Sequence, residues 1–382
     1  MKNLSISHGV VMRMKCKDNI FGYLGWPSIA RCPDGRLIAA ASGMRVGHVC
    51  PFGKSMISYS SDEGKTWTVP AIANDTPLDD RDTGIINIGD GRLALTWFTN
   101  SRAFQRNYIS NGDLKLKALF NAYLDLVTDE MEDSNIGSFI RYSDNNGGMW
   151  SDKVKVPVST PHGPILLKNG KMLYFGKELD GYYPNIDLQA DTKVKDKFIA
   201  AYTSDNKGQD WMLLGKVPLT PNTISDNFHE PHAIELENGD ILGFIRTEGM
   251  IEGKNVFTLY KTMSQDGGYT WSIPEPTGIN GSPPHLIRHS SGAVICSYAD
   301  RNGKASAQKV MISNDECKSW EIDYIIDDRA VDGDIGYPAS QELNDGSILT
   351  LYYQKYPGDV KTSILYTIWI LPEGITVKQD IR

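Results

Sequence analysis

Four side chains suited to bond cleavage stand at fixed distances from glycines that end short turns. Asp82, Glu230 and Tyr337 each precede such a glycine by nine residues, and Arg246 follows one by seven. A phenol is a weak nucleophile at neutral pH, and a carboxylate that takes its proton activates it. A second carboxyl can protonate a leaving group, and a guanidinium can bind an anionic group. If these positions converge, the sequence predicts an acid–base site built around a tyrosine.

The glycines belong to six repeats of two apolar strands joined by a tight turn. The repeats read "SIARCPDGRLIAAAS", "GIINIGDGRLALTWF", "PILLKNGKMLYFG", "HAIELENGDILGFIR", "HLIRHSSGAVICSYA" and "ASQELNDGSILTLYY", with turn glycines Gly35, Gly91, Gly170, Gly239, Gly292 and Gly346. Asp-Gly and Asn-Gly between two strands are strong hairpin signals, because a tight turn needs positive φ. Equivalent positions in the repeats should lie at the same end of the sheets, so the four side chains are expected to meet.

A second repeat alternates with the hairpins and is predicted to be scaffold. It reads "SSDEGKTW", "SDNNGGMW", "SDNKGQDW", "SQDGGYTW" and "SNDECKSW". The Asp or Ser can bond nearby backbone groups while the Trp packs between strands. In an antiparallel meander these turns fall at the end opposite to the candidate chemistry.

Six hairpins, each followed by further strands, predict an all-β, six-bladed β-propeller of four-stranded antiparallel blades. Residues 1–382 are expected to form one domain. The sixth repeat has no box, and "NLSISHGVVMRM" at the start is a strand without a blade, so the N-terminal strand should complete the last blade. An insertion at about 100–138 in blade two has helical periodicity, and it either packs on the blade flank or forms a substrate lid or dimer contact.

Composition excludes several classes of protein. A net charge of −8 and a pI near 5.4 disfavour nucleic acid and anionic membranes as partners. The N-terminus lacks the apolar core of a signal peptide, which predicts a cytoplasmic protein; a trimmed leader would leave the same start, so export stays an alternative. The five cysteines have no CxxC spacing, and no cofactor is expected. The oligomeric state stays open.

The boxes and hairpins together resemble the Asp-box, or BNR, repeats of the sialidase (neuraminidase) superfamily of six-bladed propellers, over essentially the whole chain. This resemblance implies a glycoside hydrolase that acts on a glycan. "EPHAIELENGDILGFIR" resembles the blade with the Glu partner of the nucleophile and one carboxylate-binding Arg, which implies these roles for Glu230 and Arg246. "YPASQELNDGSILTLYY" resembles the blade with the nucleophilic Tyr, which implies that role for Tyr337.

Two elements of the family pattern are missing. The Phe-Arg-Ile-Pro signature corresponds to "LGWP", so Gly25 replaces the first carboxylate-binding Arg. The general-acid Asp is absent from "SGMRVGHVCPFGKS", which offers Arg45, His48 and Lys54, and the third Arg has only Arg301 and Lys304 as loose candidates. The resemblance therefore implies a divergent site with an incomplete arginine triad.

Histidines and the acidic segment "DDRDTG" are the predicted substitutes. Asp80, Asp82 or His48 is the expected proton donor. The expected substrate-binding residues are Trp26, Arg45, Arg81, His162, His229, His232, His285 and Arg301, beside Arg246. The histidines could instead satisfy backbone groups, and because no HExxH-type spacing exists no metal ligands are assigned. Tyr182 and Tyr183 could stack on a sugar ring.

Three functions stay open from the sequence: a glycoside hydrolase, a non-catalytic carbohydrate-binding propeller, and a His-rich, metal-assisted polysaccharide lyase. Retention of both Tyr337 and Glu230 in register favours the hydrolase, because a binding protein has no evident use for that pair.

Overall fold

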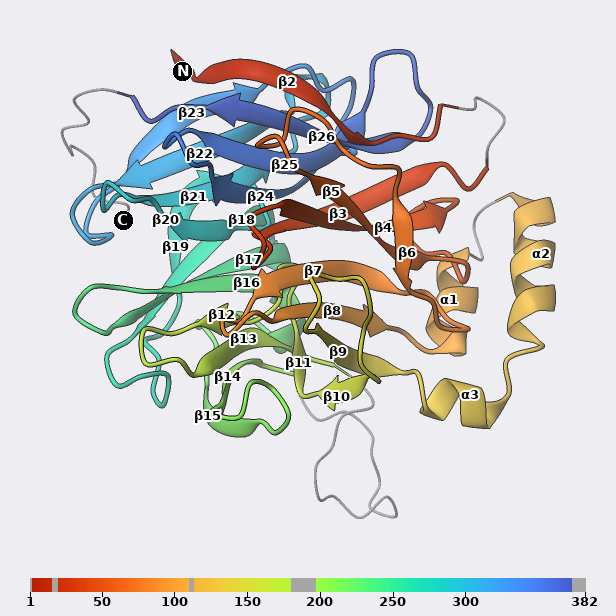
Figure 1. The fold of residues 1–382 in the computed structure, drawn as a ribbon. Coiled ribbons are helices and arrows are strands. Elements are labelled where there is room, and N and C mark those ends of the chain that lie inside the picture. The colour runs from red at the N-terminus through yellow and green to blue at the C-terminus, as the bar shows by residue number, and fades with distance from the viewer. Residues whose placement is uncertain (1, 16–19, 110–112, 180–196, 373–382) are drawn as a thin grey trace.

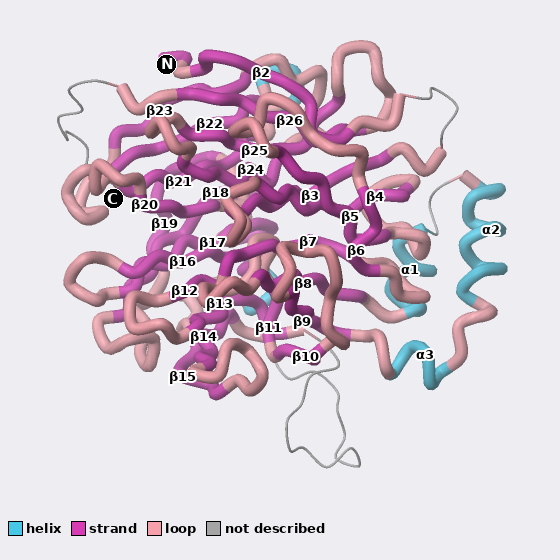
Figure 2. The backbone as a smooth tube through the Cα atoms, in the orientation of Figure 1, coloured by secondary structure: helices cyan, strands magenta, loops and turns pink. Residues whose placement is uncertain are grey.

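The computed structural model describes residues 2–15, 20–109, 113–179 and 197–372. Six small sheets stand around a common axis, and they are almost entirely antiparallel (Figures 1 and 2). The predicted six-bladed propeller is confirmed.

Each of the first three blades starts with its innermost strand. Blade 1 holds β3 (Tyr23–Arg31), β4 (Leu37–Arg45), β5 (Lys54–Ser60) and β6 (Ala71–Asn74). Blade 2 holds β7 (Arg81–Asn87), β8 (Leu93–Thr99), β9 (Gly137–Ser143) and β10 (Val154–Val156). Blade 3 holds β12 (Ile165–Leu166), β13 (Met172–Glu178), β14 (Ile199–Ser204) and β15 (Met212–Lys216), with β11 (Val158–Ser159) also paired to β13.

The last three blades repeat the order, and the N-terminus completes two of them. Blade 4 holds β16 (Phe228–Glu235), β17 (Ile241–Ile251), β18 (Lys254–Ser264) and β19 (Glu275–Asn280). Blade 5 holds β20 (His285–Arg288), β21 (Val294–Asp300), β22 (Ala307–Ser313) and β23 (Glu321–Asp327), with β1 (Lys2–Asn3) parallel to β23. Blade 6 holds β24 (Gly336–Glu342), β25 (Ile348–Lys355), β26 (Thr362–Trp369) and β2 (Ser5–Met12).

The ring closes through the N-terminal strand, as predicted. β2 pairs antiparallel with β26, so the first and last strands of the ring share one sheet. Apolar clusters fill the space between neighbouring blades; one of them joins Leu24 and Leu37 of blade 1 to Leu349 and Leu351 of blade 6. Burial between blades, rather than within one sheet, therefore holds the ring together.

The boxes are scaffold at the hairpin end of the blades. In the first box the Ser60 hydroxyl accepts from Gly64 N at 2.9 Å, and the Trp67 indole N–H donates to Gly64 O at 2.9 Å. Hydrogen bonds from Thr66 lower the pKa of Asp62 to about 2. Four boxes also reach the hairpin turn of the preceding blade, through the contacts Glu63 to Asn344, Asn146 to Asp34, Lys207 to Asp90 and Glu316 to Glu237.

The insertion in blade 2 forms three helices, α1 (Arg102–Ile109), α2 (Leu114–Leu124) and α3 (Asp129–Asp133), between β8 and β9. Phe120 of α2 packs with Phe52, and Leu124 packs with Leu78, so the insertion covers the loop between β4 and β5 and the loop that leads from β6 into blade 2. The inner face of α2 thus packs on loops at the end where the innermost strands begin, rather than on the flank of a blade. No described helix is long and apolar enough to cross a membrane.

Candidate active site

Four blades present a side chain from the same strained backbone position. Trp26, Asp82, Glu230 and Tyr337 have φ values of 54°, 49°, 40° and 52°, which is the left-handed region. The pairing register with the second strand shifts around each of them. Non-glycine residues rarely adopt this conformation, and it costs roughly 1 kcal/mol or more, so four copies in one ring indicate a functional constraint. These are the positions that the count from the turn glycines selects.

Tyr337, Glu230 and Arg246 make direct contact. The Tyr337 hydroxyl donates a short hydrogen bond to Glu230 Oε1. Arg246 Nη1 lies 2.6 Å from Glu230 Oε2 and 3.1 Å from Tyr337 Oη. Glu248, two residues along β17, accepts from Arg246 Nη2 at 2.7 Å and fixes the guanidinium. The Glu230 side chain is 22% exposed, so solvent reaches its carboxylate.

The electrostatics give this pair the protonation states of a base and a nucleophile. Burial and the charge of Glu230 raise the pKa of Tyr337 well above its usual value. Burial alone would raise the pKa of Glu230, but the Arg246 charge and the hydrogen bonds from Tyr337 and Arg246 outweigh it and lower that pKa. The carboxylate is thus ionised and the phenol protonated, ready for proton transfer between them.

Asp82 is the acidic residue of "DDRDTG" with a free oxygen. It is only 3% exposed, and among the described residues its Oδ1 has no hydrogen-bond partner. Burial raises the pKa of Asp82 to about 7, against the attraction of Arg81, and the negative charge of Glu230 adds to the rise. Asp82 is therefore substantially protonated at neutral pH.

Two other predicted site residues, Asp80 and Arg45, already have partners within the chain. Burial also raises the pKa of Asp80 to about 7, but its oxygens accept hydrogen bonds from Asn74 and Thr76. Arg45, a predicted substrate ligand, is completely buried in an ion pair with Asp79 at 2.6 Å and donates to the carbonyl oxygens of Asp80 and His48. These contacts hold the loop after β4, so Arg45 is corrected from a substrate ligand to a structural residue.

Two further guanidinium groups approach the tyrosine. Arg301 lies with its Cζ 5.6 Å from the centre of the Tyr337 ring, and Arg81 lies 4.9 Å from the centre of the Trp26 ring. Within the described part of the chain neither makes an ion pair, and the Nε of each is buried without a partner. Phe257, which sequence reasoning missed, lies between Arg246 and Arg301, at 5.3 and 5.6 Å from their Cζ atoms. Gly25 stands where the family has its first arginine, yet three guanidinium groups, those of Arg81, Arg246 and Arg301, lie near the site.

Trp26 carries one wall of the site. Its ring contacts Tyr337 edge-on at 6.2 Å and His48 at 5.6 Å between ring centres. His48 Nε2 lies 3.0 Å from Asp334 Oδ1, and the Tyr23 hydroxyl donates to the same oxygen at 2.9 Å. Asp334 and Tyr23 were missed from the sequence, although Asp334 stands three residues before Tyr337 in "DIGY".

The predicted histidines divide into two groups. His229 is partly exposed beside Glu248, 3.8 Å away. His162, His232 and His285 lie together and buried, with ring centres 4.5 to 5.7 Å apart. His232 Nδ1 accepts from Leu286 N and His285 Nδ1 accepts from Ser340 N, each at 3.1 Å and each on the next blade.

These contacts define the chemistry of His232 and His285, whereas both ring nitrogens of His162 are buried without a hydrogen-bond partner among the described residues. A neutral imidazole whose Nδ1 accepts a backbone N–H carries its own proton on Nε2, so neither His232 nor His285 offers a metal a free lone pair. Among the described residues no group of three His, Cys, Asp or Glu side chains could hold a metal ion. His232 and His285 therefore satisfy backbone groups between blades, one of the two roles that the sequence left open. Tyr182 and Tyr183 lie outside the described residues.

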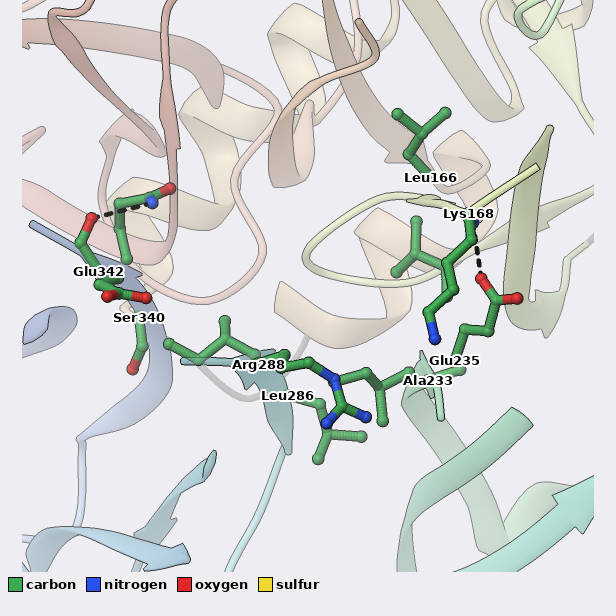
Figure 3. A pocket seen from close by; sticks show the side chains of 12 residues that line it. Leu166, Lys168, Ala233, Glu235, Leu286, Arg288, Ser340 and Glu342 are labelled. Carbon is green, nitrogen blue, oxygen red and sulfur yellow. Dashed lines mark hydrogen bonds between the residues drawn. The ribbon is translucent and has the colours of Figure 1, made fainter. Parts of the chain in front are cut away.

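A cavity of about 420 Å³ lies near the hairpin turns, and none of Tyr337, Glu230, Arg246 and Asp82 lines it. Leu166 and Leu286 line it, together with the charged side chains of Lys168, Glu235, Arg288 and Glu342 (Figure 3). The charged groups are already bonded: Glu235 accepts from Lys168 N at 2.7 Å, Arg288 pairs with Glu316 at 2.7 Å, and Glu342 accepts from Ser290 N at 2.8 Å. The chemistry therefore lies at the end where the innermost strands begin.

Solved structures share this fold over nearly the full chain. A protein of unknown function from Dyadobacter fermentans matches with a TM-score of 0.73 and 20% identity, covering 96% of this chain and 99% of that one. The NanB sialidase from Streptococcus pneumoniae matches with a TM-score of 0.65 and 17% identity, over 95% and 70%. An α-L-arabinanase from Penicillium chrysogenum, complexed with arabinobiose, matches with a TM-score of 0.63 and 17% identity, over 97% and 99%.

At these identities the likeness shows the fold alone. A search of curated proteins finds no match. The BNR repeat-like domain family, in contrast, matches residues 118–350, which is more than half of the chain. The chain belongs to the BNR repeat-like domain family, and its six-bladed propeller is the fold of the sialidases and arabinanase that it resembles.

Proposed function

We propose that this protein is a retaining glycoside hydrolase for an acidic sugar, with Tyr337 as the nucleophile. The observation that carries the proposal is the contact among the Tyr337 hydroxyl, the Glu230 carboxylate and the Arg246 guanidinium. A phenol needs a base within hydrogen-bond reach, and Glu230 is an ionised carboxylate at that distance.

The reaction has two steps. In the first, the Tyr337 oxygen attacks the anomeric carbon and its proton passes to Glu230, while Asp82 gives a proton to the departing glycosidic oxygen. A glycosyl–tyrosine bond forms as the glycosidic bond breaks. In the second, Asp82 takes a proton from water, the hydroxide oxygen bonds to the anomeric carbon as the glycosyl–tyrosine bond breaks, and the proton on Glu230 returns to the tyrosine oxygen. Two displacements at one carbon retain its configuration.

The cations near Tyr337 support an acidic sugar. Arg301 makes no ion pair among the described residues, and the hydroxyl of Tyr353 is its nearest hydrogen-bond partner, at 3.4 Å. A buried guanidinium without a carboxylate is costly unless a ligand supplies the anion, and a carboxylate can bind two of its N–H groups at once. Arg81, on the side of Trp26, offers a second unpaired cation.

The test is hydrolysis of a panel of aryl glycosides of neutral and acidic sugars by the wild-type protein and by Tyr337→Phe. We expect turnover with an acidic sugar and its loss, by roughly 10³-fold or more, in the variant. Tyr324→Phe is the matched control, because Tyr324 also donates to a glutamate, Glu321, but on the outer strand of blade 5. Equal activity of both variants would contradict the proposal.

A further inference from the structure

The helical insertion has an outer surface that the propeller does not use. Figure 1 shows α2 at the outer edge of the molecule. The inner side of α2 buries Phe120 and Leu124, whereas Leu114 and Leu119 of the helix, and Leu126 just after its C-cap, are 80%, 44% and 73% exposed. Ala118 and Ala122 are exposed between these leucines. Apart from Lys115, the exposed side chains on the outer side of α2 are apolar, and an apolar patch of this kind commonly marks an interaction surface.

The charges near this surface differ between the two ends of α2. Lys115 and Lys117 lie in the first turn of α2, after its N-cap Asp113, whose carboxylate accepts from Lys115 N at 2.8 Å. Asp125 is the C-cap, and the acidic α3 follows it. Among the described residues, neither lysine forms an ion pair, and neither Glu130 nor Asp133 of α3 does. Arg102 pairs with Asp129 and Glu132, and Arg106 pairs with Asp125, so within the described part of the chain two lysines at one end and two carboxylates at the other have no ion pair.

We propose that the outer side of α2 packs against the same surface of a second copy of this chain, with the two helices antiparallel across a two-fold axis. A two-fold interface must be self-complementary, and an antiparallel pair places the Lys115 and Lys117 end of each helix beside the acidic α3 of the other. The leucines then cover one another, and Ala118 and Ala122 at the centre let the two helices approach closely. This charge complementarity selects a second copy over an unrelated partner, and the inference is independent of the proposed reaction.

Sedimentation analysis of the full chain from about 1 to 100 µM tests the pairing. The weight-average mass should rise toward twice the chain mass of 42.4 kDa. Leu119→Glu should raise the dimer dissociation constant by roughly 100-fold or more, because each substitution acts twice across the axis. Its control is Val69→Glu, which changes a valine that is 88% exposed in blade 1 and should leave the dimer unchanged. Both sites are exposed, so at protein concentrations low enough for every variant to be monomeric the melting temperature should not move.

Charge reversal tests the antiparallel arrangement. The variant Lys115→Glu/Lys117→Glu and the variant Glu130→Lys/Asp133→Lys should each dimerise more weakly than the wild type, and an equimolar mixture of the two should recover dimers. A wild-type protein that stays monomeric at 100 µM, or a dimer that Leu119→Glu does not weaken, would overturn the proposal. A mixture that pairs no better than its components would also overturn it.

Discussion

Asp82→Asn removes the proton of a buried carboxyl and keeps the shape of the side chain, so it separates proton donation from packing. General acid catalysis contributes about 10²- to 10⁴-fold, and we expect that loss in kcat/KM on a glycoside whose leaving alkoxide must be protonated. A 4-nitrophenyl glycoside of the same sugar departs without a proton, so its loss should stay below about tenfold. In the wild type, kcat/KM on the first substrate should fall tenfold per pH unit above about 7, where Asp82 ionises, and the variant should lack this limb.

The same substitution should stabilise the protein at alkaline pH. The folded state raises the pKa of Asp82 from 3.8 to about 7, so it holds this proton more tightly than the unfolded chain does. Stability from this group is therefore full below pH 3.8 and is lost as the pH rises through 7, by an amount on the order of 4 kcal/mol. Asp82→Asn lacks that loss, so urea unfolding at pH 8 should show a gain relative to the wild type, and at pH 4 little difference.

Asp80→Asn is the matched control for the kinetic measurements only, because burial raises the pKa of Asp80 to about 7 as well. Its oxygens accept from Asn74 and Thr76, so the change should destabilise the fold and affect the two substrates equally. Equal losses on the two substrates in Asp82→Asn, or an unchanged alkaline limb, would refute the assignment of the proton to Asp82.

Two further predictions concern the scaffold. Trp67→Ala should lower the free energy of unfolding by roughly 2 kcal/mol, because a partly buried ring and its hydrogen bond to Gly64 are lost. Turnover per folded molecule should stay unchanged. Lost turnover at an unchanged melting temperature would instead show that the box is part of a functional site. The buried histidines should destabilise the protein in acid. Burial lowers the pKa of His232 to about 4, so below pH 6.5 the unfolded chain binds more protons than the folded protein does. The free energy of unfolding should therefore fall by up to about 1.4 kcal/mol per pH unit for each histidine. His232→Gln should flatten that fall between pH 6.5 and 4 in urea titrations, and an equal slope in both proteins would contradict the burial argument.

The sequence predicts this fold well because its signals are local and repeated. Each turn glycine marks a hairpin, and each box marks the return of the third strand, so strand order follows by counting. The same count places Trp26, Asp82, Glu230 and Tyr337 at one end, because the repeat fixes the distance from the turn to the start of the innermost strand. Their left-handed backbone could not be predicted, since nothing in the residue types requires it.

The remaining site residues were not predictable for identifiable reasons. Phe257 and Asp334 stand in irregular segments or long hairpins, where distance from a turn glycine no longer fixes position. The roles of Arg45 and His232 depend on which backbone groups of a neighbouring blade lack partners, and a single sequence does not contain that information. The sequence predicted Arg81 as a substrate ligand but not what holds its side chain in place. In the structure the Arg81 guanidinium stacks on the Trp26 ring, beside Tyr337.

The most direct test of the central claim is to trap the sugar on Tyr337. A fluorinated glycoside of the preferred acidic sugar, with a good leaving group, slows breakdown of the intermediate more than its formation. Mass spectrometry of the quenched, digested protein should then find one glycosyl adduct on the peptide that contains Tyr337, and none in Tyr337→Phe. An adduct on another residue, or turnover of the natural substrate that survives in Tyr337→Phe, would contradict the account.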